Sequence, residues 1–184
     1  MVTGEQLKKI VPLIGVKLKV FLVPLNDAMD EFNINTPLRQ SAFIAQIAHE
    51  SGSFRYVSEI ASGKVYDNRK DLGNTDPEAI RVAKLNNSTP GRWWKGHGLI
   101  QITGYYNHLK CGKALGLDLV NNPLLLTLPV DACRSAAWFW ETNGLNALAE
   151  MEDFKLITKK INGGYNGLED RLQFYERAKK VLCI

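Results

Sequence analysis

The sequence predicts a mainly α-helical protein with a minor β element. Apolar residues recur at helical spacing in several segments, as at Leu168, Leu172 and Tyr175. Helix start and stop signals bracket these segments. Between them, residues 61–75 and 84–92 are rich in Gly, Asn, Asp, Ser and Lys, a composition typical of loops. The combination favours a helical body interrupted by one polar, loop-rich insertion.

Local signals place the individual helices. We expect helices at 4–11, 17–32, 37–50, 76–84, 104–115, 130–142, 153–161 and 168–182. Thr3 and Gln6 form a capping-box pattern at the first of these, and Thr36 before Pro37 is a typical start for the third. Asn143-Gly144 is a stop signal after 130–142. A small β-hairpin is expected around 54–66.

The length of 184 residues fits one domain, 1–184, with two lobes. The expected helical body comprises 1–50 and 100–184, and the polar loop-rich lobe spans about 51–99. We expect a cleft between the two lobes. No internal repeat or low-complexity segment indicates a second domain.

Composition excludes several classes of protein. The chain is 45% hydrophobic and 23% charged, as in ordinary soluble globular proteins. Its net charge of +4 is mild and lacks a dense Lys/Arg block, which argues against nucleic acid as the partner. The apolar run Val20–Leu25 is too short to span a membrane, and the first residues do not resemble a signal peptide.

The cysteines and histidines do not indicate a metal or cofactor. Cys111, Cys133 and Cys183 lack metal-ligand spacing and are expected to be reduced and mostly buried, although a Cys111–Cys133 bridge stays open. The three histidines show no zinc spacing, and His49 is expected to be structural. We therefore predict no cofactor and no metal site.

The segment Ala48–Gly52 places a carboxyl group at the end of an apolar helix. Glu50 shares a helix face with Phe43 and Ile47, and Ser51-Gly52 is a stop signal. Burial and the negative end of the helix both favour a protonated carboxyl, so Glu50 is a candidate proton donor. Glu59, nine residues on in a polar segment, is a candidate for the ionised partner that glycoside hydrolysis requires. The alternative is a solvated helix end with no catalytic role.

Two further segments combine the residue types of a sugar site. Gln101 and Thr103 share a face, and Tyr106 and Asn107 add an aromatic ring and an amide. The alternative is a tight core turn in which the aromatic residues serve packing. The segment 161–167, Ile-Asn-Gly-Gly-Tyr-Asn-Gly, allows backbone to approach a ligand or simply joins two helices.

Together these motifs resemble family 19 of the glycoside hydrolases, with the short bacteriophage endolysin branch as the closest likeness and plant chitinases sharing the same motif order. The motifs, running from about residue 27 to 182, are Ala48–Gly52, Glu59, Gly96–Thr103, Ile161–Gly164 and Asp170-Arg171. The resemblance implies a lysozyme-like, mainly helical fold. It also implies an inverting mechanism, in which the two carboxyl groups lie roughly 6.5–9.5 Å apart.

The resemblance also implies roles for individual residues. Glu50 is similar to the family's general acid and Glu59 to its general base, and Thr103 takes the place of the Ser or Thr that helps to hold the water. The expected substrate-contacting residues are Gln101, Tyr106, Asn107 and Asn162. Arg171 is expected to orient the acidic centre, since it could pair with a buried carboxylate.

One position departs from the family pattern. Gly96-His97-Gly98 stands where the family usually has Gly-Arg-Gly. Histidine lacks the bidentate fork of arginine, and it titrates near neutrality, so this change could move the pH optimum. Neither proposed proton-transfer group is altered, and we expect activity to persist.

The resulting hypothesis is a phage endolysin that hydrolyses the β-1,4-linked glycan strand of bacterial peptidoglycan. Without a signal peptide or a separate wall-binding domain, we expect a monomer that stays in the host cytoplasm until a holin releases it to the periplasm and cell wall, with no stable membrane insertion. The alternatives are a chitinase acting on N-acetylglucosamine polymers, a lytic transglycosylase, or an inactive glycan-binding domain.

Overall fold

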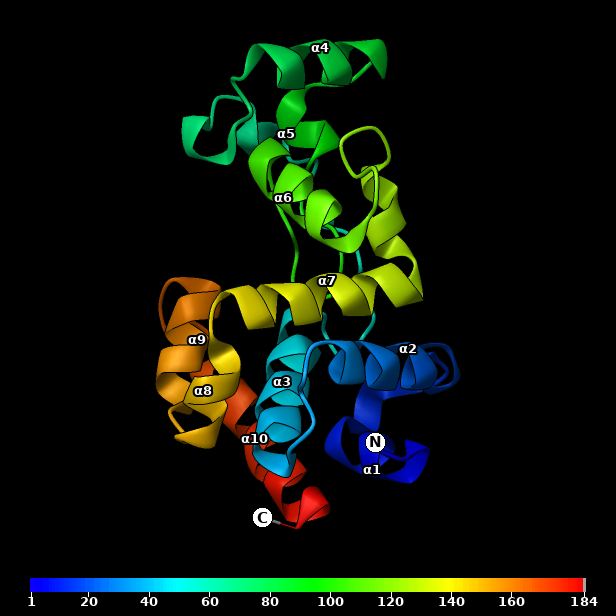
Figure 1. Ribbon diagram of the computed structural model, residues 1–184, viewed down its shortest axis with the longest axis vertical. Helices are drawn as coiled ribbons and strands as arrows, with labels where there is room; N and C mark the ends of the chain where they lie inside the picture. Colours follow the sequence, from blue (N-terminus) through cyan, green and yellow to red (C-terminus); the bar gives the residue numbers. More distant parts are fainter. Residues whose placement is uncertain (184) are drawn as a thin grey trace.

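The computed structural model describes residues 1–183 and is built almost entirely from helices. The α-helices are α1 (Gly4–Ile10), α2 (Lys17–Glu31), α3 (Pro37–Glu50), α4 (Pro77–Leu85), α5 (Pro90–Trp93), α6 (Tyr105–Leu115), α7 (Pro129–Thr142), α8 (Leu145–Glu150), α9 (Phe154–Asn162) and α10 (Leu168–Leu182). The short 3₁₀ helices are η1 (Pro12–Ile14), η2 (Lys64–Tyr66), η3 (Lys70–Leu72) and η4 (Pro123–Thr127). Figure 1 shows two lobes, with α4, α5 and α6 in the upper one and α7 lying across the top of the lower one.

The predicted helices all form, with ends within one or two residues of those expected. The Thr3–Gln6 capping box is present, and the Thr36 side chain caps α3 by accepting from the Arg39 backbone N–H. Both signals supply hydrogen bonds to N–H groups that a helix start leaves unpaired. The short helices α5 and α8 were not predicted.

The predicted hairpin around 54–66 is wrong. Residues 1–183 contain no named strand, and only two isolated antiparallel bridges, Ser58 with His97 and His97 with Ile102, occur. After Glu59 the chain passes through Gly63, which has a left-handed conformation (φ 77°), into the 3₁₀ turn η2, so no second strand follows within this segment. The backbone at 58 therefore pairs with the distant segment around 97.

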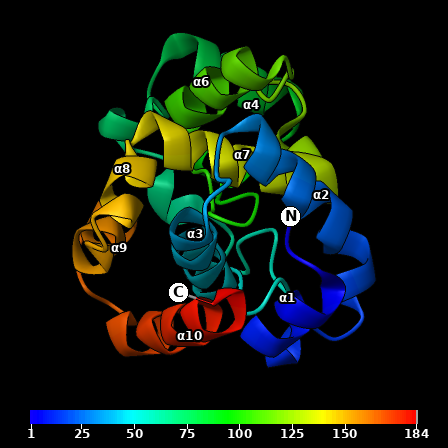
Figure 2. The same ribbon diagram turned by 60° about the horizontal axis from the view of Figure 1, so that its bottom comes forward.

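Helix α3 lies at the centre of the larger lobe. Its side chains from Gln40 to Ala48 are buried, as the apolar run predicted. Figure 2 looks along the lobe and shows α3 enclosed by a ring of the other helices, with α10 alongside it. The Phe43 ring meets the Trp140 ring of α7 edge-on, 5.3 Å between centroids. Because the helix is enclosed, its last residue is held in a fixed place.

The smaller lobe has its own apolar core. Ala79, Val82 and Ala83 of α4 pack with Trp94 and Tyr105, the last two rings lying 5.0 Å apart. Tyr105 begins α6, which Figure 1 shows in the upper lobe, while Cys111 and Leu115 at the other end of this helix pack in the main core; the sequence predicted that residues 100–184 would belong to the helical body. The smaller lobe thus extends past residue 99.

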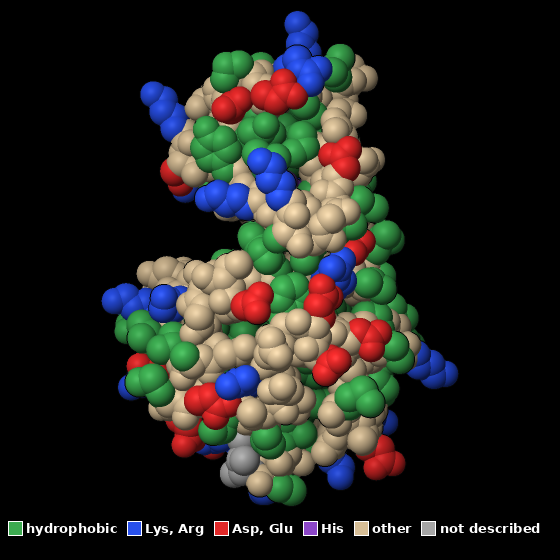
Figure 3. All heavy atoms as spheres, viewed as in Figure 1, with side chains coloured by type: hydrophobic (Ala, Val, Ile, Leu, Met, Phe, Trp, Pro, Cys, Tyr) green, Lys and Arg blue, Asp and Glu red, His purple; other side chains and the backbone are tan. Residues whose placement is uncertain are grey.

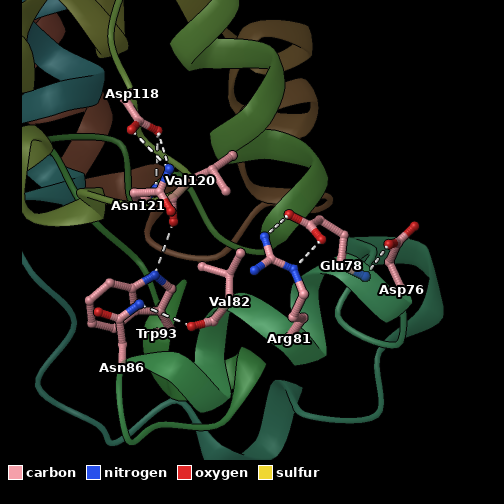
Figure 4. Close-up of polar contacts among 9 residues, drawn as sticks. All are labelled: Asp76, Glu78, Arg81, Val82, Asn86, Trp93, Asp118, Val120 and Asn121. Carbon is pink, nitrogen blue, oxygen red and sulfur yellow. Dashed lines mark hydrogen bonds and ion pairs between the residues drawn. The ribbon is translucent and has the colours of Figure 1, made fainter.

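Polar contacts fasten the outer part of the smaller lobe. The Trp93 indole N–H donates to the Val120 carbonyl at 3.0 Å, joining α5 to the loop that follows α6 (Figure 4). In the same view Arg81 forms a two-pronged ion pair with Glu78 on α4, at 2.6 and 2.7 Å. The first contact joins two segments of the lobe, whereas the second is an exposed pair within one helix.

The three cysteines are free thiols. Cys111 and Cys133 are buried and Cys183 is exposed, so the bridge left open by the sequence does not form. Burial raises the pKa of Cys111 to about 12 and raises that of Cys133 as well, which keeps both thiols protonated and unreactive.

Among the helices of residues 1–183, none has both the length and the apolar character needed to cross a bilayer.

Candidate active site

Glu50 is the last residue of α3, and a tight left-handed turn follows it. The Ser51 hydroxyl donates to the Ile47 carbonyl at 2.6 Å and accepts from the Phe54 N–H at 2.9 Å. Three successive residues have positive φ, namely Gly52 (56°), Ser53 (64°) and Phe54 (66°). This conformation is costly for residues with a side chain. The buried Phe54 ring anchors this turn. Helix α3 therefore ends at Glu50.

The Glu50 carboxylate is bound by Arg171 of α10. Arg171 Nη2 donates to Glu50 Oε1 at 2.5 Å, and the Arg171 side chain is completely buried whereas that of Glu50 is 19% exposed. The same guanidinium donates to Gln46 Oε1 at 2.6 Å and to the Asn166 carbonyl at 3.3 Å. Within residues 1–183, Glu50 Oε2 has no hydrogen-bond partner. This arginine–carboxylate contact agrees with the pairing expected for Arg171 from the sequence.

Gln46 is a member of this network that the sequence analysis missed. Its side chain is fully buried, and its Nε2 donates to Thr158 Oγ1 of α9 at 2.8 Å. Thr158 in turn donates to the Phe154 carbonyl at 3.0 Å. The available signal was an amide inside the apolar run before Glu50, one turn earlier on the same face. Gln46 thus links α9 and α10 beneath the glutamate.

His49 makes a parallel contact with the neighbour of Arg171. Its Nδ1 lies 2.6 Å from Asp170 Oδ2, so two consecutive residues of α3 bind two consecutive residues of α10. The ring rests against Gly167 (φ 69°), where an added Cβ would overlap it. The short segment before α10 therefore needs glycine for both backbone conformation and space.

Glu59 is held by the smaller lobe. Its Oε1 accepts from the Tyr66 hydroxyl and its Oε2 from the Gly96 N–H, both at 3.1 Å. Its backbone also pairs with Gly96, and Lys95 Nζ donates to its carbonyl at 2.8 Å. Burial, together with the Glu59 charge and hydrogen bond, raises the pKa of Tyr66, which keeps this hydroxyl a donor.

Two of the predicted binding residues and the predicted water-holding residue meet at one pocket. Gln101, Thr103 and Asn107 line a cavity of about 520 Å³ between the lobes. Figure 3 shows the notch between the lobes in which α6 faces α7. Thr103 Oγ1 donates to the Gln101 carbonyl at 2.9 Å, and Asn107 Nδ2 donates to the Thr103 carbonyl at 2.8 Å. These bonds fix the polar wall of the pocket.

The pocket adjoins Glu59 through Gly96. An added Cβ on Gly96 would lie 2.6 Å from Gln101 Oε1, so glycine lets the Gln101 side chain cover the residue that binds Glu59. Gln101 itself has a φ of 57° and is anchored by donating to the Gly98 carbonyl at 2.8 Å. Neither Glu50 nor Glu59 is among the residues that line the pocket. The cavity thus lies next to the residues that hold Glu59.

Tyr106 and Asn162 are placed differently from the other predicted residues. The Tyr106 ring packs on Gly73, and its hydroxyl lies 3.4 Å from Asp76 Oδ2, so it faces the smaller lobe and does not line the pocket. Asn162 is the exposed last residue of α9, and its neighbour Ile161 lines the pocket. A role for either residue in binding remains a prediction.

His97 forms a buried pair with His108. His97 Nδ1 lies 3.2 Å from His108 Nε2, and His108 Nδ1 lies 2.9 Å from the Gly104 carbonyl. Since a carbonyl only accepts, His108 carries its proton on Nδ1 and accepts from His97 Nδ1–H. This arrangement assigns His108 as a neutral imidazole and His97 as a donor through Nδ1.

Burial explains why this pair does not act as an arginine would. It lowers the pKa of His97 to about 4 and that of His108 to about 3, from an ordinary value of 6.5. Titration of His97 near neutrality, expected from the sequence, is therefore wrong. His97 has no carboxylate partner within residues 1–183, and it replaces a family arginine with a neutral packing residue.

No group of three or more His, Cys, Asp or Glu residues in the described part of the chain is arranged to hold a metal ion.

Sequence comparison identifies relatives of this chain. The model of glycoside hydrolase family 19, described as chitinase class I, matches residues 33–153. An endochitinase of Arabidopsis thaliana is 37% identical over 151 residues, covering 78% of this chain and 48% of the plant protein. A family 19 domain-containing protein of Haemophilus influenzae is 28% identical over 158 residues, covering 75% of this chain and 77% of that protein. The chain thus spans about half the length of the plant relative.

Solved structures have the same fold. A bacterial family 19 chitinase superposes with a TM-score of 0.73 at 22% identity, covering 100% of this chain and 95% of that one. Chitinase C from Streptomyces griseus gives 0.72 at 21% identity, covering 98% and 76%. The helical, lysozyme-like architecture predicted from the sequence is therefore confirmed. With the family match and the Arabidopsis relative, these comparisons show that the chain belongs to family 19 of the glycoside hydrolases.

Proposed function

We propose that this protein hydrolyses the β-1,4-linked glycan strand of bacterial peptidoglycan by an inverting mechanism, acting as a phage endolysin. The observation that carries the catalytic part is the presence of two held carboxyl groups. Glu50 Oε1 is bound by a buried guanidinium, whereas Glu59 is bound by two neutral donors, a hydroxyl and a backbone N–H. Because a guanidinium favours the charged form of a carboxyl group, this contrast does not make Glu50 the proton donor, and the division of roles comes from the resemblance of Glu50 to the family's acid and of Glu59 to its base.

Glu50 is the proposed general acid. With Arg171 on Oε1, the free Oε2 is the oxygen that would carry the proton to the leaving glycosidic oxygen. When that proton leaves, the resulting carboxylate is stabilised by the guanidinium already in contact with it. Arg171 thus favours the charge distribution that develops during bond cleavage.

Glu59 is the proposed general base. Each of its oxygens accepts one hydrogen bond and retains a lone pair for a proton from water. Thr103 is proposed to help hold that water, because its hydroxyl hydrogen is engaged by the Gln101 carbonyl and its oxygen remains an acceptor in the pocket wall. Attack by this water on the face opposite the leaving group inverts the anomeric centre.

Product analysis tests the reaction type. Purified peptidoglycan digested by the protein should yield new reducing ends, and the first-formed anomer should be inverted. Products with 1,6-anhydro ends would identify a lytic transglycosylase instead. Glu50→Gln and Glu59→Gln should each abolish turnover while retaining fold and glycan binding, because each keeps the shape of the side chain but not its proton chemistry. An active Glu50→Gln variant would contradict the acid assignment, and binding of glycan without turnover by the parent protein would favour a glycan-binding role.

A chitinase acting on N-acetylglucosamine polymers is the second candidate. The names of the relatives favour it, since the matching plant proteins are endochitinases and the superposed structures are chitinases. Release of soluble sugar from chitin, compared with clearing of outer-membrane-permeabilised bacteria at equal enzyme concentration, distinguishes the two. As an endolysin, the protein is proposed to be a monomer that stays in the host cytoplasm until a holin releases it to the periplasm and cell wall. Lysis on co-expression with a holin, and none without it, tests that part.

A further inference from the structure

The pocket between the lobes contains one formal charge. Its lining comprises aliphatic, aromatic and neutral polar side chains and a single ionisable one, Lys110. Lys110 lies on α6, three residues after Asn107, so the two share a face of that helix. No acidic side chain is part of the lining. The only formal charge among the residues that line the cavity is therefore positive.

Lys110 has no ion-pair or hydrogen-bond partner for its ammonium group in the part of the chain that the structure describes. None of the ion pairs and hydrogen bonds of residues 1–183 involves its ammonium group, and the residue is exposed. Other lysines of the chain do make contacts, such as Lys95 with the Glu59 carbonyl and Lys179 with Glu152 and Glu176. A free ammonium group beside apolar walls is available to an anionic ligand.

From this arrangement we infer that Lys110 binds a carboxylate carried by the glycan, and so selects an acidic sugar polymer over a neutral one. The inference rests on the proposed hydrolysis of peptidoglycan and names the feature of the substrate that the pocket recognises. Trp138 and Phe139 of α7 contribute apolar surface for a sugar ring or its ether substituent, and Asn107 an amide beside the ammonium group. The pocket thus combines a stacking surface, a neutral polar wall and one cation.

Two carboxylates of the polymer have this chemistry. In a glycan strand without peptides, the lactyl ether of every second sugar ends in a carboxylate. In a strand with peptides that group is an amide, and the carboxylates lie further out on the peptide. Peptide-free and peptide-bearing strands therefore distinguish the two sources. Stronger dependence on Lys110 with peptide-free strands would place the lactyl carboxylate at the ammonium group.

The test uses three variants and matched ligands. Lys110→Met removes the charge at similar length, and Lys110→Arg keeps it. Lys113→Met is the control, since Lys113 is one turn away on α6 and lines a different cavity. Each is measured with carboxylated glycan strands, with the same strands after reduction of the carboxyls to alcohols, and with a neutral N-acetylglucosamine oligomer.

Lys110→Met should lower kcat/KM for carboxylated strands about threefold to tenfold, the effect of one partly exposed charged contact. It should change the values for reduced strands and the neutral oligomer less than twofold, and Lys110→Arg and Lys113→Met should match the parent on every ligand. The difference should shrink at high salt, because exposed charges are screened. Equal loss on charged and neutral ligands, or no loss on either, overturns the inference.

Binding measurements test the carboxylate site independently of whether the protein hydrolyses peptidoglycan. In a Glu50→Gln background, affinity for carboxylated against reduced strands is compared with and without Lys110→Met. If the parent fails to cut peptidoglycan, the proposed function fails, but a charge preference that disappears with Lys110→Met still supports the carboxylate site. If the parent cuts peptidoglycan and binding is indifferent to both the carboxyls and Lys110, the proposed function stands and the inference fails.

Discussion

Arg171 donates to Glu50 from a fully buried position, and the same guanidinium also bonds to Gln46 and to the backbone at Asn166. The bonds come from three different nitrogens of one planar group, so the direction of the Glu50 carboxylate depends on a rigid fork. A buried pair of this kind is costly to break from one side, since the remaining partner keeps its charge or its unmet hydrogen bond.

Arg171→Lys should therefore separate charge from geometry. Lysine keeps the positive charge but cannot serve the three acceptors in one plane, so we expect turnover to fall at least about tenfold and the free energy of unfolding to fall by about 1–3 kcal/mol. Steady-state kinetics and urea unfolding measure the two effects. Arg177→Lys, at an exposed backbone contact on the same helix, should change neither. Near-parental turnover of Arg171→Lys would show that charge alone suffices.

The contact between Gln46 and Thr158 should support Arg171 from below. Gln46→Leu leaves buried groups on Arg171 and Thr158 unpaired and should cost about 1–3 kcal/mol of stability and part of the turnover. Thr158→Val should cost less, and the double variant should fall short of the sum because the residues touch. Ser41→Ala is the control, since the Ser41 hydroxyl is buried on the same helix without a partner. Additive effects in unfolding experiments would rule out this coupling.

Gly167 and Gly163 offer a matched pair of substitutions. Both have positive φ, 69° and 75°, but an added Cβ at 167 overlaps the His49 ring whereas at 163 nothing lies within 4 Å. Gly163→Ala should show only the backbone cost of about 1–2 kcal/mol. Gly167→Ala should cost more and also lower turnover, because His49 precedes Glu50. Thermal unfolding and steady-state kinetics measure the two effects. Equal losses of stability and turnover in both variants would mean that the contact between Gly167 and His49 contributes to neither.

The buried histidine pair should make the protein less stable in acid. Both rings are neutral in the folded state, with pKa values of about 4 for His97 and about 3 for His108, against 6.5 ordinarily. Below pH 6.5 the unfolded chain therefore binds more protons than the folded one, and stability falls as pH decreases towards 4. Each histidine contributes up to about 1.4 kcal/mol per pH unit in this range.

Two measurements check that dependence. Urea midpoints taken from pH 7 to pH 4 should decline, and the ring resonances of His97 and His108 should stay in the neutral form at pH 5.5. A protonated His97 at that pH would contradict the assignment. Above pH 6.5 this contribution to stability is fully present, so the pair should not shape activity near neutrality.

Sequence patterns predicted most of the fold because the start signals and apolar spacing of these helices lie within the helices and their immediate neighbours. Caps at Thr3 and Thr36 and the apolar run of α3 depend only on neighbouring residues. The hairpin prediction was wrong because the partner of the backbone at Ser58 is His97, far along the chain, and local alternation carries no information about it. Helix α5 has only four residues, too few for a periodic signal.

Some contacts of the candidate site could likewise be predicted from the sequence, and others could not. The contact of Arg171 with Glu50 was expected from motif order, while Gln46 was overlooked because one amide within an apolar helix has no meaning until its partners on α9 and α10 are known. Tyr106 shows what sequence proximity does not determine. Adjacent helical residues point about 100° apart, so Asn107 lines the pocket whereas the Tyr106 ring lies on Gly73.

The two candidate glutamates are attached to different bodies. Glu50 ends a helix of the larger lobe and is bound by α10, whereas the Glu59 oxygens are bound by Tyr66 and Gly96 of the smaller lobe. Any rotation of one lobe against the other therefore changes the distance between the two carboxyl groups. In an inverting enzyme that distance must admit a water molecule. A change in the width of the notch would therefore change the spacing of the proposed acid and base, and a crosslink between the lobes would fix that spacing.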